Sequence, residues 1–276
     1  MSVRLQFRIL GSGAGTGVPS FFCSCPGCLE ARSKKEYART RSCAVVETGA
    51  GTVLVDASPD LRSQLVREMI TSVDCVFLTH WHYDHYSGLG ELEYYVKLER
   101  KEKLPLYLPP SAVMQFETVF PNLADVFHSA PWQFFQRYGF GGIYITPLPA
   151  NHSVETAGFL IESSSSKIAY FPDTAGLPEA TARKVRGVDF LVCDATFYGE
   201  NWFPEAHMSV KEAIQLGRQV EAKRTVLTHL SIHYSRPVTS EELEKEAARH
   251  QGVVVARDGM SLNLRECLLL HTGLLS

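Results

Sequence analysis

The chain has 276 residues, of which 45% are hydrophobic and 21% are charged, a composition typical of a soluble globular protein. Its formal net charge of −3 shows none of the excess positive charge that nucleic-acid-binding domains usually carry, which argues against a nucleic-acid partner. No apolar run approaches the roughly 20 residues that span a bilayer, and the charged N-terminus does not resemble a signal peptide. We therefore expect one cytoplasmic domain over residues 1–276, with reduced cysteines and no membrane partner.

Short β-branched runs bounded by turn residues predict strands in both halves of the chain. The predicted strands are 6–10, 44–47, 52–55, 75–78, 106–108, 143–145, 158–161, 167–171, 190–193, 225–227, 253–256 and 261–264. Because strands outnumber helices, two packed sheets with helices outside fit the chain better than a single wound sheet.

Helix signals are fewer. A proline after an N-cap serine predicts a helix that starts at Ser58. Capping boxes predict two more helices, which follow Ser209 and Thr239. A fourth helix is expected over residues 89–99. The apolar face of the first helix is predicted to contain Leu61, Leu65, Val66 and Met69.

A glycine-rich loop at residues 11–17 follows the first predicted strand and has the composition of a dinucleotide-binding loop. That fingerprint needs a helix directly after the glycines, whereas Val18-Pro19 and a cysteine cluster follow here. We interpret the glycines as allowing the backbone to pass close to a metal site. Residues 101–142 are expected to form loops at the mouth of the pocket. The apolar tail at 268–275 leaves two alternatives open, docking on a partner subunit in a homodimer or fraying.

The densest cluster of metal-binding side chains is the stretch His80-Trp81-His82-Tyr83-Asp84-His85, directly after a predicted strand. A tight loop at a strand end lets these side chains converge on one point. Imidazole nitrogens and carboxylate oxygens suit zinc, manganese and iron. The alternative, a chance cluster of surface histidines, fits poorly with only ten histidines in the whole chain.

This H-x-H-x-D-H motif resembles the signature of the metallo-β-lactamase superfamily, and the resemblance continues in order over residues 11–263. It implies an α/β fold, the αββα sandwich, with a two-metal site at one edge of the sheets. The ligands that it implies are His80, His82 and His152 for one metal, Asp84, His85 and His229 for the other, and Asp173 as the bridge.

Some of these residues have alternatives when each is taken alone. His152 and His229 could be core histidines, and Asp173 could be an ordinary turn residue. Asp56 resembles the buried aspartate that orients a ligand loop in the superfamily, and a helix-capping role near Ser58 is its alternative.

The implied chemistry depends on two divalent cations, Zn²⁺ or Mn²⁺, held roughly 3.5–4 Å apart. A water that bridges such a pair has its pKa lowered toward ~7, so hydroxide is available at neutral pH. Hydrolysis of a phosphoester, a thioester or an amide would profit equally, so the metals alone do not choose the substrate. Asp84 is predicted to act in catalysis as well as in metal binding.

A second cluster, Cys23-x-Cys25-x-x-Cys28, lies in a proline-containing loop. Three thiolates this close favour zinc, which needs a fourth ligand to complete a tetrahedron. The resemblance suggests a histidine just beyond the last active-site ligand, and His233 is the candidate for this structural Zn²⁺ site. Redox-active or merely buried thiols are the alternatives. The other cysteines, Cys43, Cys75, Cys193 and Cys267, are interpreted as small buried hydrophobic residues.

His207 resembles the extra histidine of phosphodiesterase branches such as tRNase Z. That histidine would protonate the leaving alkoxide or hold a phosphate oxygen, and Asp194 resembles the carboxylate that orients and charges it. The alternative for His207 is a helix-entry residue bonded to the backbone.

The cysteine loop, the intact metal motif and His207 together are most similar to the PhnP family, the cyclic phosphodiesterases of the carbon–phosphorus lyase pathway in phosphonate metabolism. The implied activity is hydrolysis of a small cyclic phosphate, of the ribosyl 1,2-cyclic or nucleoside 2′,3′-cyclic type, by a hydroxide that bridges the metals.

Three other functions remain as alternatives. The PqqB family of redox-cofactor biosynthesis also resembles the chain in the cysteine loop and at residues 38–41 and 56–60, but it tends to lack the full H-x-H-x-D-H set. A tRNase Z-like nuclease fits His207, although the acidic balance of the chain argues against it. A metal-binding scaffold without turnover is the third.

Overall fold

The computed structural model describes residues 6–263, which build two seven-stranded sheets. The first sheet contains β1 (Gln6–Gly11), β2 (Cys43–Thr48), β3 (Gly51–Val55), β4 (Cys75–Phe77), β5 (Leu104–Leu108), β6 (Phe127–Pro131) and β14 (Ser261–Asn263), in the order β14-β1-β2-β3-β4-β5-β6. The second contains β7 (Tyr138–Phe140), β8 (Ile143–Pro149), β9 (Ala157–Glu162), β10 (Lys167–Phe171), β11 (Phe190–Asp194), β12 (Arg224–Thr228) and β13 (Val253–Val255), in the order β13-β12-β11-β10-β9-β8-β7.

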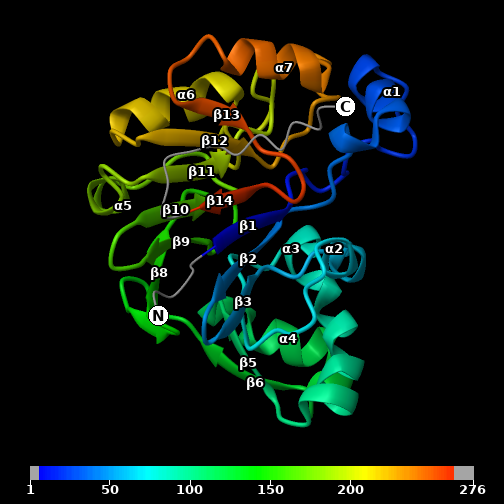
Figure 1. The fold of residues 1–276 in the computed structure, drawn as a ribbon, viewed down its shortest axis with the longest axis vertical. Coiled ribbons are helices and arrows are strands. Elements are labelled where there is room, and N and C mark those ends of the chain that lie inside the picture. The colour runs from blue at the N-terminus through cyan, green and yellow to red at the C-terminus, as the bar shows by residue number, and fades with distance from the viewer. Residues whose placement is uncertain (1–5, 264–276) are drawn as a thin grey trace.

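Helices cover the outer faces of both sheets (Figure 1). The α-helices are α1 (Pro26–Ser33), α2 (Leu61–Arg67), α3 (Tyr83–Tyr86), α4 (Val113–Val119), α5 (Glu179–Lys184), α6 (Val210–Gln219) and α7 (Ser240–Ala247). Helices α6 and α7 pack on β11, β12 and β13, whereas α2 and α4 contact the first sheet. None of the helices within residues 6–263 has the length and apolar character needed to cross a bilayer. The predicted αββα sandwich is confirmed.

The main core lies between the two sheets. Alternate side chains of each strand point to one face, so one set of apolar residues meets its counterpart across the sandwich. Phe7 and Tyr170 from opposite sheets, for example, lie with ring centroids 5.4 Å apart. Trp132 is fully buried in this layer, and its indole Nε1 donates to the carbonyl of Leu78 at 2.8 Å. Two further apolar clusters fill the spaces between each sheet and its outer helices.

Strand direction explains where a site can form. Strands β3, β4, β5 and β6 run parallel in the first sheet, and β10, β11, β12 and β13 run parallel in the second. Strand β8 also runs with β10, because both are antiparallel to β9. The carboxyl ends of β3, β4, β8, β10, β11 and β12 therefore carry their following loops to one edge of the sandwich, as ligand sites in α/β sheets often require.

Every strand predicted from the sequence is present, with boundaries shifted by a few residues; residue 264, the last of the predicted strand 261–264, lies outside the described residues. Two strands were missed, and both fall in the segment 101–142 that was expected to form loops. Strand β6 has only one buried residue and ends in a proline, and β7 is only three residues long at the edge of its sheet. Edge strands need no buried alternation, so their sequence signal is weak. The segment extends both sheets and adds α4, which corrects the prediction of loops.

The predicted start of α2 is wrong. The helix begins at Leu61 with Asp60 as N-cap, because the Ser58 hydroxyl accepts from the Asp60 amide at 3.2 Å and closes a turn before the helix. The predicted apolar face is also wrong in part: Val66 and Met69 are exposed, while Leu61 and Gln64 are buried. The capping boxes that start α6 and α7 are confirmed.

The helix expected over residues 89–99 is not a regular α-helix. A 3₁₀ helix, Ser87–Leu92, is followed by a π-helix, Tyr95–Arg100. A Cβ built at Gly88 would lie 2.0 Å from the Ser58 carbonyl, so this segment packs directly against the loop before α2. The segment that departs from α-helical geometry therefore lies against the Ser58 backbone at its start.

Candidate metal centre

Three imidazole nitrogens converge at the edge of the sandwich. His80 and His82 follow β4, and His152 follows β8. His80 Nε2 lies 3.0 Å from His82 Nδ1, which lies 3.2 Å from His152 Nε2. Ligands of a tetrahedral ion with bonds of ~2.0–2.1 Å are separated by roughly 3.3 Å, so this spacing suits one shared cation.

A second cluster lies beside the first. Asp84 Oδ2 is 3.5 Å from the Nε2 atoms of both His85 and His229. Both Nε2 atoms are buried and have no hydrogen-bond partner within residues 6–263. Buried polar atoms without a partner are costly, so an arrangement that aims two of them at one carboxylate indicates a cation site.

Asp173 lies between the two clusters. Its Oδ2 atom is 3.3 Å from His80 Nε2 and 3.7 Å from the Nε2 atoms of His85 and His229. The carboxylate is 2% exposed. One oxygen is therefore within reach of ligands from both clusters, which is the placement that a bridging carboxylate needs.

Four of the five histidine ligand candidates are held through Nδ1. His152 Nδ1 donates to the Ala206 carbonyl at 2.8 Å, and His85 Nδ1 donates to Asp56 Oδ2 at 2.8 Å. His80 Nδ1 and His229 Nδ1 lie 3.0 and 2.9 Å from threonine hydroxyls, those of Thr79 and Thr196. With Nδ1 occupied, Nε2 is left to face the centre, as in most metal-binding histidines. His82 instead faces the centre with Nδ1, and the candidate ligand atoms of each cluster lie within 4.8 Å of one another.

Asp56 is placed as the sequence suggested, under the site and not as a helix cap. It is fully buried, and Oδ1 accepts from the Thr79 amide at 2.7 Å and its hydroxyl at 3.0 Å. Asp56 and His229 are both non-glycine residues with left-handed backbone, at φ of 64° and 54°. Such conformations cost free energy and gather at functional sites.

The buried charges of the site shift the pKa values of two neighbouring histidines in opposite directions. Burial, together with the charge of the nearby His85, lowers the pKa of His80 to about 3. Burial would lower the pKa of His85 as well, but the carboxylates of Asp84 and Asp56 raise it to about 9. For Asp84 and Asp173, burial alone would raise the pKa, yet the surrounding histidines hold both carboxyls below their ordinary pKa. The centre is thus rich in negative charge, which a divalent cation would balance.

His207 lies beside the two clusters. Its Nδ1 is 2.9 Å from Asp194 Oδ2 and 2.8 Å from Asp173 Oδ1, and its ring stacks on that of His229 with centroids 5.4 Å apart. Burial alone would lower the pKa of His207, but hydrogen bonds to these carboxylates raise it to about 11. Its Nε2 makes no hydrogen bond within residues 6–263, and the side chain is 20% exposed. The ring can therefore present Nε2 to a bound molecule.

The Asp194 carboxylate is hydrogen-bonded to backbone amides. Its carboxylate accepts from the amides of Thr196 at 2.9 Å, Met208 at 3.1 Å and Thr174 at 3.3 Å. These bonds join the loops after β10 and β11 to the start of α6. Asp194 therefore positions His207, and its oxygens have little capacity left for a metal.

The glycine-rich loop approaches the centre as expected. A Cβ built at Gly15 would lie 3.2 Å from Asp84 Oδ2, so a side chain there would press on the carboxylate. Asp84 lies among the ligand candidates, and a separate catalytic role for it stays a prediction.

The cysteine cluster forms a separate group. Cys25 is the N-cap of α1 and Cys28 lies in its first turn, so the cluster opens a helix and is not a simple loop. The three thiols of Cys23, Cys25 and Cys28 lie within 4.8 Å of one another. His233 Nδ1 is 3.6 Å from Cys28 Sγ, while its Nε2 lies 2.8 Å from the Thr16 hydroxyl. A Nε2–H that donates to Thr16 leaves Nδ1 free to complete the set.

Some residues of the sequence prediction lie apart from these groups. Cys43, Cys75 and Cys193 are buried, as predicted, whereas Cys267 and the tail at 268–275 lie outside the described residues. The sequence did not point to Thr79, Thr196 or Thr16, since a threonine at a strand end or in a loop has no distinguishing pattern.

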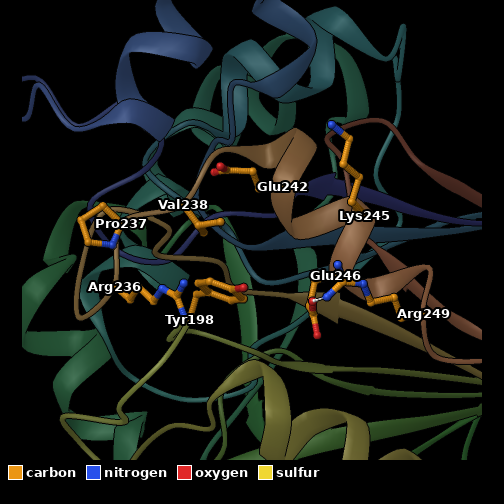
Figure 2. Close-up of a pocket in the computed structure, with 8 residues that line it drawn as sticks. All are labelled: Tyr198, Arg236, Pro237, Val238, Glu242, Lys245, Glu246 and Arg249. Atoms are coloured by element: carbon orange, nitrogen blue, oxygen red, sulfur yellow. Dashed lines mark hydrogen bonds and ion pairs between the residues drawn. The ribbon is translucent and has the colours of Figure 1, made fainter.

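Two cavities lie away from the candidate metal ligands, the smaller along α7 and the larger between α6 and the end of α7. Their volumes are about 290 and 530 Å³, and both are lined by Tyr198, Arg236 and Glu246. Figure 2 shows Tyr198 and Arg236 side by side in the smaller one. No candidate ligand lines either cavity, so they are not the metal centre.

The family follows from comparison with known proteins. Residues 51–230 match the family model described as the beta-lactamase superfamily domain, so the chain belongs to this superfamily. It is 28% identical to the coenzyme PQQ synthesis protein B of Methylobacterium sp. (strain 4-46), over 94% of this chain and all of that protein.

Two solved structures are similar over nearly the whole chain. One is a diphosphatase from the PhnP family, with a TM-score of 0.83 and 27% identity over 96% of this chain and 100% of the other. The second is Zn²⁺-bound PqqB from Methylobacterium extorquens, with a TM-score of 0.77 and 23% identity over 94% and 99%. At 23% identity, the likeness to PqqB shows a shared fold alone.

Proposed function

We propose that this protein is a metal-dependent phosphodiesterase that hydrolyses a small cyclic phosphate. The observation that carries the proposal is His207, held by Asp194 next to two clusters of metal-ligand side chains and with Nε2 open to a bound molecule. A superfamily member that only binds metal has no need of a positioned proton donor. The likeness to a PhnP-family diphosphatase supports a phosphorus ester as the substrate class.

The donor set fits two divalent ions. His80, His82 and His152 would hold one, Asp84, His85 and His229 the other, with Asp173 shared. The orphaned Nε2 atoms of His85 and His229 support this assignment. When bound, two such cations supply hydroxide at neutral pH and neutralise charge on the substrate oxygens. Imidazole and carboxylate ligands suit both Zn²⁺ and Mn²⁺.

The chain's own contribution to the reaction is the proton on His207 Nε2. An alkoxide leaves a phosphodiester poorly unless it is protonated as the bond breaks, and a positioned acid contributes about 10²–10⁴-fold. Asp194 keeps the ring in one orientation, because the same carboxylate is bonded to three backbone amides. The proton is thereby held at a fixed distance from the ligand clusters.

The cysteine group is proposed to hold a structural Zn²⁺ with His233 as fourth ligand. Three thiols and one ring nitrogen form a common structural zinc set. The site would join α1 to the loop after β12, two segments about 200 residues apart in the chain, since Cys28 and His233 are separated by 205 positions.

A cofactor-biosynthesis role of the PqqB kind is a second candidate. It is favoured by the match over the full length of a PqqB protein at 28% identity, close to the identity with the PhnP-family structure. The two candidates differ in whether a phosphodiester is turned over.

The experiment that separates them is reconstitution. Protein stripped of metal with a chelator is reloaded with Zn²⁺ or Mn²⁺ and offered methyl ribofuranoside 2,3-cyclic phosphate, a linear dialkyl phosphate and bis-p-nitrophenyl phosphate. We expect turnover that returns with two metals per chain in addition to the structural Zn²⁺, and that is faster on the cyclic than on the linear dialkyl ester. A protein with both metals bound that hydrolyses none of them would contradict the proposal and favour the PqqB role.

A further inference from the structure

Two adjacent aromatic side chains stand on the loop that leads to His207. Trp202 and Phe203 are each 51% exposed, in the connection between β11 and α6. The chain has three tryptophans, and of the other two, Trp132 is fully buried and Trp81 stacks on Tyr86. Trp202 therefore differs from the other two tryptophans, because about half of its surface is in solvent and it lies on the loop that leads to a candidate catalytic residue.

The loop fixes these rings relative to His207. The His207 amide donates to the Phe203 carbonyl at 2.9 Å, so one hydrogen-bonded turn separates the two residues. Asn201 Oδ1 accepts from the Phe203 amide at 3.0 Å, and Asn201 Nδ2 donates to the His207 carbonyl at 2.8 Å and to Glu212 at 3.0 Å. Glu212 belongs to the capping box of α6, so the loop is anchored to a helix.

The rings form a continuous aromatic group. Phe197 is 2% exposed and lies with its centroid 6.1 Å from those of Trp202, Phe203 and His207. On the other side, Trp202 lies 6.0 Å from Tyr234. Phe197 thus links the two exposed rings to the ring of His207, and about half of the surface of Trp202 and Phe203 stays in solvent.

We propose that Trp202 and Phe203 form a stacking site for the nucleobase of the substrate, so that the proposed phosphodiesterase acts on a nucleoside 2′,3′-cyclic phosphate. The proposal rests on the function proposed above. Aromatic side chains stack with any base, because every base has a π face. A base attached to a ribose whose phosphate lies at the metal centre has a platform prepared next to the proton donor.

The charges around the platform favour a single nucleotide over a strand. Exposed Glu200 and Glu205 bracket Trp202 and Phe203 in the loop. A strand of RNA would bring additional phosphates against these carboxylates, and strand-binding grooves are instead lined with positive charge. One cyclic phosphate at the metals with one base on the platform avoids this repulsion.

The test compares two substrates with the same strained ring: adenosine 2′,3′-cyclic phosphate, and methyl ribofuranoside 2,3-cyclic phosphate, which has no base. In the metal-loaded enzyme, Trp202→Ala should raise KM for the adenosine substrate on the order of tenfold, with kcat within about twofold. KM for the base-free substrate should stay within about twofold, and Trp202→Phe should recover most of the loss. Tyr94→Ala removes an aromatic ring that is 69% exposed on another element and serves as the matched control.

A binding measurement separates the stacking site from the reaction. Calorimetric titration of adenosine 3′-monophosphate should show affinity in the wild-type protein that falls about tenfold in Trp202→Ala. If no phosphodiester is hydrolysed but this Trp202-dependent affinity is present, the proposed reaction fails and the stacking site stands. If hydrolysis occurs and Trp202→Ala changes KM for both substrates equally or for neither, the stacking site is overturned.

Discussion

Asp56 Oδ2 lies 2.8 Å from Nδ1 of His85, in a fully buried pair beneath the clusters of candidate metal ligands. The carboxylate accepts the Nδ1 proton, so a cation bound at Nε2, which faces Asp84, would hold His85 as the neutral Nδ1–H tautomer. The tautomer of a metal-binding histidine depends on this type of contact.

Asp56→Asn should therefore weaken the metal site without disturbing the fold. Asparagine tolerates the left-handed backbone at this position, and its carbonyl can still accept from Thr79. Its amide would donate to His85 Nδ1 and so move the proton to Nε2. We expect the affinity for one metal to fall by about 10–100-fold, measured by competition with a chelator.

The control for this change is Asp74→Asn. Asp74 precedes β4, at the opposite end of that strand from His80, where it pairs with Arg100 at 3.2 Å. The variant should bind both metals as the wild type does. Equal affinities in Asp56→Asn and wild type would show that Asp56 does not set the tautomer.

Asp173→Ala should abolish turnover in step with the loss of metal. The carboxylate is the group within reach of histidines from both clusters, so its removal leaves two cations with no shared anion between them. We expect metal content and rate to fall together, while the melting temperature of the metal-free protein changes much less. Metal analysis and kinetics on one preparation provide the measurement, and near-normal turnover with two metals still bound would refute the bridging role.

Cys25→Ser tests the structural zinc. Structural zinc sites have apparent binding free energies of roughly 10–16 kcal/mol in small peptides, so the wild-type zinc should survive mild chelation that strips the active pair. The variant should lose this zinc and melt at a lower temperature. Cys43→Ala, which removes a buried thiol outside the cluster, should keep it. A wild-type protein with no zinc after mild chelation, or an unchanged zinc content in Cys25→Ser, would leave the thiols without a metal role.

The sequence predicted which candidate ligands would lie together where those residues are neighbours in the chain. His80, His82, Asp84 and His85 are so close in the chain that a strand end and a tight loop must bring them together. The other ligand candidates, such as His152 and Asp173, follow strands whose parallel directions place their ends at one edge.

Other features could not be predicted from pattern alone. The buried face of α2 includes Gln64, whose amide donates to the Arg41 carbonyl. The helical spacing of apolar residues therefore predicted the wrong buried face for this helix. Strands β6 and β7 lie at sheet edges with little buried alternation. The hydroxyls of Thr79 and Thr196 orient ligands only through tertiary contacts, which leave no mark in the local sequence.

The most direct test of the proposed mechanism is the effect of His207→Ala on two leaving groups. With an alkoxide leaving group, as in a 2,3-cyclic phosphate, the rate should fall by about 10²–10⁴-fold, because the proton donor is lost. With p-nitrophenolate, which leaves without a proton, the loss should be much smaller at equal metal content. Equal losses on both substrates, or no loss on either, would contradict the assignment of His207 as the proton donor.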